Sequence, residues 1–268
     1  MSSPIGIFDS GVGGLSVFKE IIRIMPGEDI VYLGDTARSP YGNKNKETIL
    51  QYSLENISFL QRLGVKLVVI ACHTSCTNAL QELQKIFSLP LFNVLYPSLQ
   101  KLPQVTKTNH IAILATLSTI ASGVYQNRLS QFALYPIACS RFVPLIEEGF
   151  FTHPLLEKAA DEYLEPLQKT QIDTVLLACT HYPFISKILQ KKLPNQVKLV
   201  DPAYDVAKEI YTFLRQEGKC SFKATQGNYR FYVTGEPEKF KKIADRIFDF
   251  SIGTPQRVSL GKTISQKI

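Results

Sequence analysis

Hydrophobic and polar residues follow one another along the chain in blocks that are typical of an α/β protein. Short, unbroken apolar runs predict buried parallel strands, and a segment with apolar residues at every third or fourth position follows most of them, which predicts helices. In the first part of the chain, the expected strands are residues 5–8, 29–33, 67–71 and 91–95, and the expected helices are residues 15–25, 46–63 and 78–87.

The same order of elements is repeated in the second part of the chain. Its expected strands are residues 110–115, 132–138, 175–178 and 197–200. One expected helix ends near residue 130, a second covers residues 155–168 and is bent or ended by Pro166, and a third begins at Pro183. The pattern therefore predicts a duplicated α/β unit with parallel or mixed sheets. The expected fold is two pseudosymmetric, doubly wound α/β domains that face each other across a cleft.

The last part of the chain predicts a helix at 207–214, an edge strand at 228–233 and a final helix at 237–247. We expect this tail to pack on the first unit, which makes that domain discontinuous. The predicted domains are residues 1–97 with 207–268, on the side of Cys72, and residues 98–206, on the side of Cys179.

Composition narrows the class of protein. The apolar fraction of 45% and charged fraction of 20% are those of a soluble globular protein, and no apolar run approaches a membrane span. The N-terminus lacks the features of a secretory signal, and the five cysteines show no disulfide-like spacing, so a cytoplasmic location is expected. The net charge of +7 raises nucleic-acid binding as an alternative, but no basic run is interleaved with aromatic residues.

Two cysteines occupy matching places in the repeated pattern. Cys72 and Cys179 each follow an apolar run that ends in Ala, and each precedes a Thr and a His in either order. Open α/β sheets bind ligands at the carboxyl ends of their strands. The sequence therefore predicts two thiols at equivalent positions of one binding cleft.

Two opposed thiols indicate a particular chemistry. One thiolate can remove a proton from a carbon while the other thiol returns a proton to the opposite face, which inverts the configuration. Helices that follow both cysteines are expected to lower the thiol pKa toward working pH. The alternative is that each cysteine is a small buried hydrophobe, which the matched pair disfavours. Cys76 fits packing better than chemistry, and Cys139 and Cys220 have no chemical context.

Polar residues at the predicted strand ends complete the candidate site. Ser10, Thr74 and Thr180 supply hydroxyl groups, and Asp9 can orient or deprotonate the first thiol. His181 and Glu147 can assist the second, and Glu147 also suits a substrate ammonium group. Helix capping is the alternative role for Asp9 and Ser10. The glycines that follow them do not form a dinucleotide fingerprint, because Ser16 stands at the third glycine's place.

Several segments are distinctive when taken together: Phe8-Asp9-Ser10-Gly11-Val12-Gly13-Gly14-Leu15, Gly34-Asp35-Thr36-Ala37-Arg38-Ser39-Pro40-Tyr41-Gly42, Ala71-Cys72-His73-Thr74, Val143-Pro144-Leu145-Ile146-Glu147-Glu148-Gly149, Ala178-Cys179-Thr180-His181-Tyr182-Pro183 and Val233-Thr234-Gly235. With these segments the chain resembles, over nearly its whole length, the cofactor-independent glutamate racemases of bacterial cell-wall synthesis.

The resemblance implies interconversion of L- and D-glutamate for peptidoglycan, with neither pyridoxal phosphate nor a metal. It implies that Cys72 and Cys179 are the acid/base thiols and that Asp9, Glu147 and His181 assist them. The residues that it places around the substrate are Asp9, Ser10, Tyr41, Gly42, His73, Thr74, Thr180 and His181.

The chain departs from the family pattern at three places. His73 stands where the family usually has Asn, and it can act as a substrate donor or share the base role. Ala178 replaces a common Gly, which narrows the cleft slightly. Asp201-Pro202-Ala203 replaces the more usual Asp-Ser-Gly.

Other functions remain open at this point. An aspartate racemase would share the paired thiols, although the Tyr41-Gly42 loop favours glutamate. A zinc hydrolase could use Cys72, His73, Cys179 and His181 as ligands, and a non-catalytic binding protein could share the fold. The expected partner is L- or D-glutamate and the expected assembly a homodimer, with no membrane. Some members of the family inhibit DNA gyrase, so gyrase binding is conceivable, although the sequence does not support it.

Overall fold

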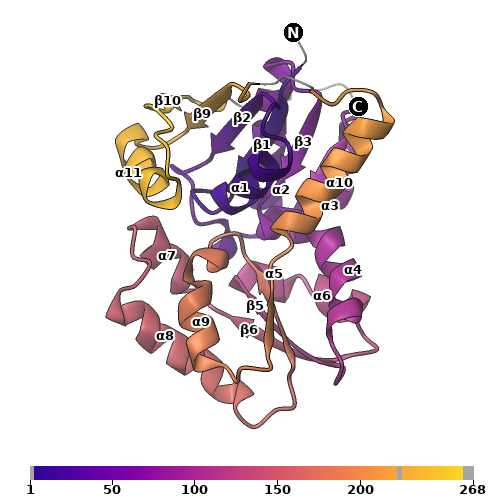
Figure 1. Cartoon of the computed structure of the whole chain (residues 1–268), viewed down its shortest axis with the longest axis vertical. Coiled ribbons are helices and arrows are strands. Elements are labelled where there is room, and N and C mark those ends of the chain that lie inside the picture. The colour runs from indigo at the N-terminus through magenta and orange to yellow at the C-terminus, as the bar shows by residue number, and fades with distance from the viewer. Residues whose placement is uncertain (1–2, 222–224, 262–268) are drawn as a thin grey trace.

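The computed structural model describes residues 3–221 and 225–261, and it contains two β-sheets flanked by helices (Figure 1). The first sheet has the strand order β10-β9-β2-β1-β3-β4, and the second has the order β6-β5-β7-β8. The first sheet consists of β1 (Ile5–Asp9), β2 (Ile30–Gly34), β3 (Leu67–Ile70), β4 (Leu91–Asn93), β9 (Tyr229–Val233) and β10 (Gln256–Arg257). The second consists of β5 (His110–Ala115), β6 (Ala133–Ala138), β7 (Thr174–Ala178) and β8 (Lys198–Val200).

The two sheets repeat one arrangement. The order β2-β1-β3-β4 corresponds strand for strand to β6-β5-β7-β8, and every strand pairing within the described residues is parallel. The predicted fold class, two α/β units with doubly wound sheets, is confirmed. In both units the central strands β1 and β5 have neighbours on each side, so their carboxyl ends meet those of β3 and β7.

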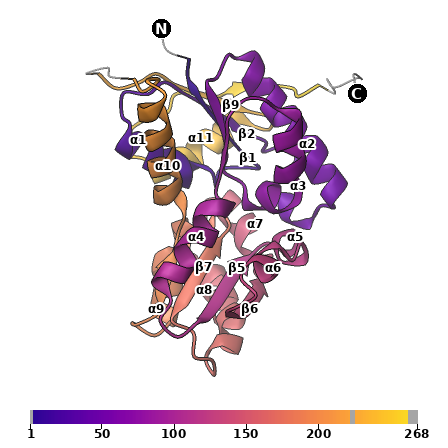
Figure 2. The same cartoon turned by 90° about the vertical axis from the view of Figure 1, so that its right-hand side faces the viewer.

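Helices cover both faces of each sheet, as apolar strands without alternation require. Around the first sheet lie α1 (Leu15–Ile24), α2 (Lys46–Arg62), α3 (His73–Ile86), α10 (Ala203–Gln216) and α11 (Pro237–Ile247). Around the second lie α4 (Leu95–Val105), α5 (Leu117–Ala121), α6 (Val124–Arg128), α7 (Phe142–Glu147), α8 (Pro154–Leu164) and α9 (Ser186–Lys192). Figure 2 shows α3 of the first unit beside α5 of the second, and the two helices are in contact.

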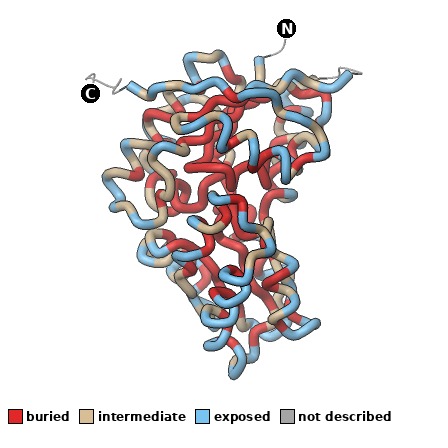
Figure 3. The backbone as a smooth tube through the Cα atoms, turned by 90° about the vertical axis from the view of Figure 1, so that its left-hand side faces the viewer, coloured by how far each residue is buried: buried red, intermediate tan, exposed pale blue. Residues whose placement is uncertain are grey.

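Buried residues continue through the junction of the two units (Figure 3), and one hydrophobic cluster includes residues from both sheets. In β5, Ile111, Ile113 and Ala115 belong to the large cluster shared with the first sheet, whereas Ala112 and Leu114 face a second cluster under α8 and α9. Successive side chains of a strand point to opposite faces, so β5 is buried on both. The large cluster therefore contains residues of both sheets.

The C-terminal tail returns to the first sheet. Strand β9 pairs with β2, and α11 follows it. Strand β10, which the sequence pattern did not predict, pairs with the other side of β9, so β9 is not the edge strand that we expected. The two predicted domain boundaries fall within α4 and α10, and the division into domains stays a prediction. Residues 1–2, 222–224 and 262–268 of the predicted domains lie outside the described residues.

Several helices differ from the predicted ones. Helix α3 begins at His73, not at residue 78, because tertiary packing overrides the low helix propensity of a Thr- and Ser-rich first turn. Helix α4 was missed because of Pro97 and Pro103. Pro97 lies in the first turn, where proline is tolerated, and the Asn93 side chain accepts hydrogen bonds from the first helical amides.

The remaining differences concern the second unit and the tail. Between the expected strand at 132–138 and the expected helix at 155–168, where no helix was predicted, lies α7, which ends before Gly149 at a φ of 78°. The expected helix up to residue 130 is divided into α5 and α6 by Gly123, at a φ of 66°. Helix α10 begins at Ala203, four residues before the expected start at 207. Among the described residues, no helix is both long and apolar enough to cross a membrane.

Candidate active site

Cys72 lies between β3 and the first turn of α3, and its side chain is buried. Its Sγ donates a long hydrogen bond of 3.7 Å to Oγ of Ser10, which directly follows β1. Burial, followed by the negative charge of Asp9, raises the pKa of the Cys72 thiol to about 12. The helix start was expected to lower this pKa. The backbone of Ser75, in the first turn of α3, does lower it, but burial raises it by more.

Cys179 directly follows β7 and is also buried. Its Sγ lies 3.7 Å from Nδ1 of His181, and Nε2 of the same ring lies 2.7 Å from Oε1 of Glu147, at the end of α7. Burial lowers the pKa of His181, but hydrogen bonds to Cys179 and Glu147 and the charges of both groups outweigh it, so this pKa is raised well above its usual value. The Cys179 thiol therefore faces an imidazolium that Glu147 holds in place.

Asp9 joins the two units at the site. Its carboxylate accepts a hydrogen bond of 3.0 Å from the amide of Gly11 and one of 3.1 Å from the Thr180 hydroxyl. The amide of Val12 donates to Glu147 over 3.0 Å. Burial raises the pKa of Asp9, and the charge of His181 opposes that rise. Hydrogen bonds thus connect the end of β1 and the residues after it to the loop that follows β7 and to the end of α7.

Two glycines permit this close approach. A Cβ at Gly11 would lie 1.9 Å from Oε1 of Glu147, and one at Gly13 would lie 2.4 Å from Nδ1 of His181. Both distances are far below van der Waals contact. Only glycine at these two positions allows the two units to approach this closely.

The two cysteines line a single cavity between the units. Its other walls come from residues just after strand ends, in the first turn of α3, in the loop before α2 and in α7: Ser10, Pro40, Tyr41, Gly42, His73, Thr74, Thr116, Val143, Thr180 and His181. The space between these side chains is about that of one water molecule. Nine of the eleven predicted site residues therefore line one cavity, and Asp9 and Glu147 lie behind its wall in contact with Thr180 and His181.

Three lining residues were missed in the sequence: Pro40, Thr116 and Val143. Thr116 follows β5, the counterpart of β1, so the rule that ligands bind at strand ends could have found it. Its hydroxyl lies 2.9 Å from that of Thr74. Pro40 and Val143 carry no chemical signal, since they contribute apolar wall only.

His73 lines this cavity, and within the described part of the chain neither of its ring nitrogens has a hydrogen-bond partner. It is 3% exposed. Burial lowers its pKa to about 3, so the ring is neutral at physiological pH. A neutral imidazole offers one donor and one acceptor, and both are free to bind a ligand.

The zinc-hydrolase alternative requires several of these side chains to converge on one point. In residues 3–221 and 225–261, no group of three or more His, Cys, Asp and Glu side chains is arranged to hold a metal ion. The ligand set expected for zinc is therefore not assembled, although all four of its candidate residues line the cavity.

The family model for "Asp/Glu/Hydantoin racemase" matches residues 5–209, which include both cysteines and every predicted site residue. The chain belongs to this racemase family. The resemblance noted in the sequence is thereby confirmed, and the matched segment contains both parallel sheets except β9 and β10.

Relatives within the racemase family cover nearly the whole chain. Glutamate racemase from Carboxydothermus hydrogenoformans is 40% identical over 97% of both chains, and that from Geobacter metallireducens is 38% identical over 96% of both. The structure of glutamate racemase from Francisella tularensis in complex with D-glutamate is 34% identical, with a TM-score of 0.89 over 97% of this chain and 98% of that one. Aspartate racemase from Picrophilus torridus, at 16% identity and a TM-score of 0.59, shares the fold.

Proposed function

We propose that this protein interconverts L-glutamate and D-glutamate, with Cys72 and Cys179 as the two acid/base groups. The observation that carries the proposal is that both thiols line one cavity from equivalent strand ends of the two units. The racemase family and relatives of 38–40% identity support glutamate as the substrate. The product serves peptidoglycan synthesis.

The proposed reaction begins with removal of the Cα proton by one sulfur. In the direction from L- to D-glutamate we assign this step to Cys179, whose sulfur lies 3.7 Å from Nδ1 of His181. The planar carbanion then takes a proton on its opposite face from the Cys72 thiol, which stays protonated because burial raises its pKa to about 12. The reverse reaction exchanges the two roles.

The remaining site residues position the substrate in this proposal. The hydroxyl groups of Ser10 and Thr74 and the backbone at Tyr41 and Gly42 line the cavity and are assigned to its carboxylates. The Thr180 hydroxyl also lines the cavity but donates to Asp9. Neutral His73 contributes a donor and an acceptor, both unpaired. Glutamate is larger than the cavity, so its binding requires the two units to lie farther apart than they do in this structure.

Circular dichroism of the purified protein tests the proposal. After exhaustive dialysis against a chelator and without added cofactor, the protein should remove the signal of L-glutamate and of D-glutamate. Aspartate enantiomers, assayed in parallel, should react at least about a hundredfold more slowly. Loss of activity that only pyridoxal phosphate or zinc restores would refute the two-thiol mechanism, and faster reaction of aspartate would refute the substrate.

We also propose that the protein acts in the cytoplasm, since all five cysteines are free thiols. A homodimer and binding to DNA gyrase stay predictions. Sedimentation of the pure protein over a range of concentrations tests the first, and inhibition of gyrase supercoiling tests the second.

A further inference from the structure

The loop between β2 and α2 forms one wall of the cavity. It leaves β2 at Asp35 and returns through the short helical turn Tyr41–Asn43, and Pro40, Tyr41 and Gly42 line the cavity. A Cβ at Gly42 would lie 2.5 Å from Cβ of Thr116, so this turn lies directly against the second unit. The position of the turn therefore sets the width of the cavity at this wall.

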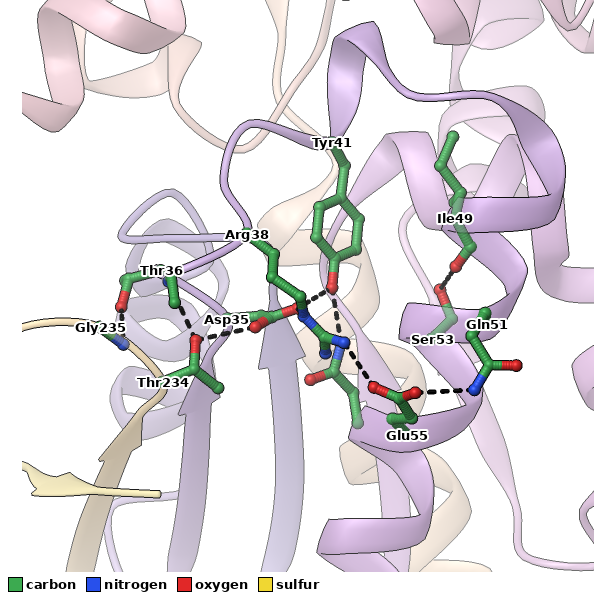
Figure 4. A network of polar contacts seen from close by, with 12 residues as sticks. Asp35, Thr36, Arg38, Tyr41, Ile49, Gln51, Ser53, Glu55, Thr234 and Gly235 are labelled. Carbon is green, nitrogen blue, oxygen red and sulfur yellow. Dashed lines mark hydrogen bonds and ion pairs between the residues drawn. The ribbon is translucent and has the colours of Figure 1, made fainter. Parts of the chain in front are cut away.

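Asp35 holds the turn from behind (Figure 4). Its carboxylate is fully buried and accepts hydrogen bonds from the Tyr41 hydroxyl and from Nε of Arg38, the latter at 2.7 Å. The Tyr41 hydroxyl in turn accepts a bond of 2.9 Å from the side-chain amide of Asn56 in α2. Burial, followed by the charge of Asp35, raises the pKa of Tyr41 well above its usual value, so Tyr41 remains a donor.

Arg38 connects the same carboxylate to α2. Its guanidinium pairs with both Asp35 and Glu55 and lies 3.9 Å from the ring centre of Tyr52. Gln51 donates to the other carboxylate oxygen of Glu55 over 2.7 Å. The buried charge of Asp35 is thus paired with that of Arg38, and Glu55 of α2 holds the guanidinium in place.

The last partner of Asp35 comes from the C-terminal tail. Thr234, which directly follows β9, donates its hydroxyl to the second carboxylate oxygen of Asp35 over 2.8 Å and accepts a hydrogen bond from the amide of Ala37 over 3.0 Å (Figure 4). The amide of Gly235 also donates to the Thr36 hydroxyl over 2.9 Å. The Thr234 side chain therefore holds both the Asp35 carboxylate, which binds the Tyr41 hydroxyl, and the backbone of the loop at Ala37.

We infer that Thr234 is a positioning residue of the reaction, which acts through Asp35 and the Tyr41 hydroxyl to hold the Tyr41-Gly42 wall against the second unit. The inference rests on the proposed function, because it assumes that this wall binds the substrate. It makes the C-terminal tail, which lies beyond the family-matched segment, a part of the site.

Thr234→Val tests the inference, because valine keeps the shape and removes the hydroxyl. The KM for both glutamate enantiomers should rise about tenfold with kcat within about threefold, as expected when binding is lost equally from substrate and transition state. Thr234→Ser, which restores the hydroxyl, should recover the KM. Hydrogen exchange of the amides of residues 36–43 should be faster in Thr234→Val and normal in Thr234→Ser.

Thr106→Val is the matched control. Thr106 also donates its hydroxyl to a carboxylate, that of Asp173 at 2.8 Å, but at the amino ends of β5 and β7, away from the cavity. It should lower the melting temperature as Thr234→Val does and leave the KM unchanged. An equal rise of KM in both variants would mean that general loosening is responsible and would overturn the inference.

Tyr41→Phe provides a second route if Thr234→Val does not fold. It removes the hydroxyl through which Thr234 is inferred to act, so it should raise the KM similarly, and in a folded double variant the two effects should not add. An unchanged KM with normal exchange of residues 36–43 would refute the inference. If the unmodified protein does not racemise glutamate, the proposed function fails, whereas the exchange result still decides whether Thr234 holds the loop.

Discussion

Cys72 and Cys179 occupy matching places in the two units, yet their polar neighbours differ in charge. On the first side, Ser10 lies 3.7 Å from the sulfur and the nearby charge is the carboxylate of Asp9. On the second, the neighbour at 3.7 Å is His181, which Glu147 supports. A duplicated fold has placed one thiol beside a negative group and the other beside a positive group.

This difference gives the two thiols unlike electrostatic surroundings before substrate binds. Burial and Asp9 keep Cys72 protonated, whereas Cys179 faces the His181 imidazolium. In the sense expected for this family, Cys179 should remove the proton from L-glutamate and Cys72 should remove it from D-glutamate.

The largest expected effect comes from removing either thiol. Cys72→Ser and Cys179→Ser should each lower racemisation more than about a thousandfold, because a serine hydroxyl is too weak an acid to replace a thiol. The measurement is loss of the circular dichroism signal of each enantiomer. Retention of a tenth of the activity in either variant would contradict the assignment.

The same variants can show that the thiols serve opposite faces. Elimination of a good leaving group from a β-substituted glutamate needs only one base. Cys72→Ser should process the L enantiomer and Cys179→Ser the D enantiomer. Elimination of both enantiomers by one variant would mean that the two sulfurs do not flank the substrate.

Glu147→Gln should reduce the difference in charge between the surroundings of Cys179 and those of Cys72. Loss of the Glu147 charge lowers the pKa of His181, so the imidazolium beside Cys179 loses its proton at lower pH. Turnover of L-glutamate at pH 8 should fall about a hundredfold, and the basic limb of its pH profile should move to lower pH. A profile that does not move would show that Glu147 acts otherwise than through His181.

His73→Asn should have a small effect on turnover. If His73 only binds substrate, asparagine can replace its donor and acceptor, and kcat should stay within about threefold or rise. A loss of more than about tenfold, or roughly 1.4 kcal/mol of barrier, together with a shift of the acidic limb, would instead place His73 in the base system.

The same variant should change how stability depends on pH. The pKa of His73 is about 3 when folded against 6.5 when unfolded, so below pH 6.5 the unfolded chain binds a proton that the folded protein does not. This should cost the unmodified protein about 1.4 kcal/mol of unfolding free energy between pH 7.5 and 5.5. The unfolding free energy of His73→Asn, from denaturant titrations at both pH values, should lack that contribution. An identical pH dependence of the unfolding free energy in the two proteins would contradict it.

Much of the fold was predictable because it depends on local patterns. The apolar runs that end near Phe8, Ile70 and Ala178 predicted buried parallel strands, and the ends of those strands predicted where Asp9, Cys72 and Cys179 lie. Helices with proline in their first turn, such as α4 and α7, were missed, since only tertiary packing and capping decide that such turns form.

The sequence by itself determined the identity of the two thiols and their equivalence, because both follow from a repeated pattern of strand, cysteine and helix. Only the tertiary structure decided the electrostatic surroundings of each thiol. The pKa of a thiol depends on burial and on charges within a few ångströms, and the charges here come from distant segments: Asp9 near Cys72, and Glu147 through His181 near Cys179. The same holds for Thr234, whose contact with Asp35 joins parts of the chain that no local pattern connects.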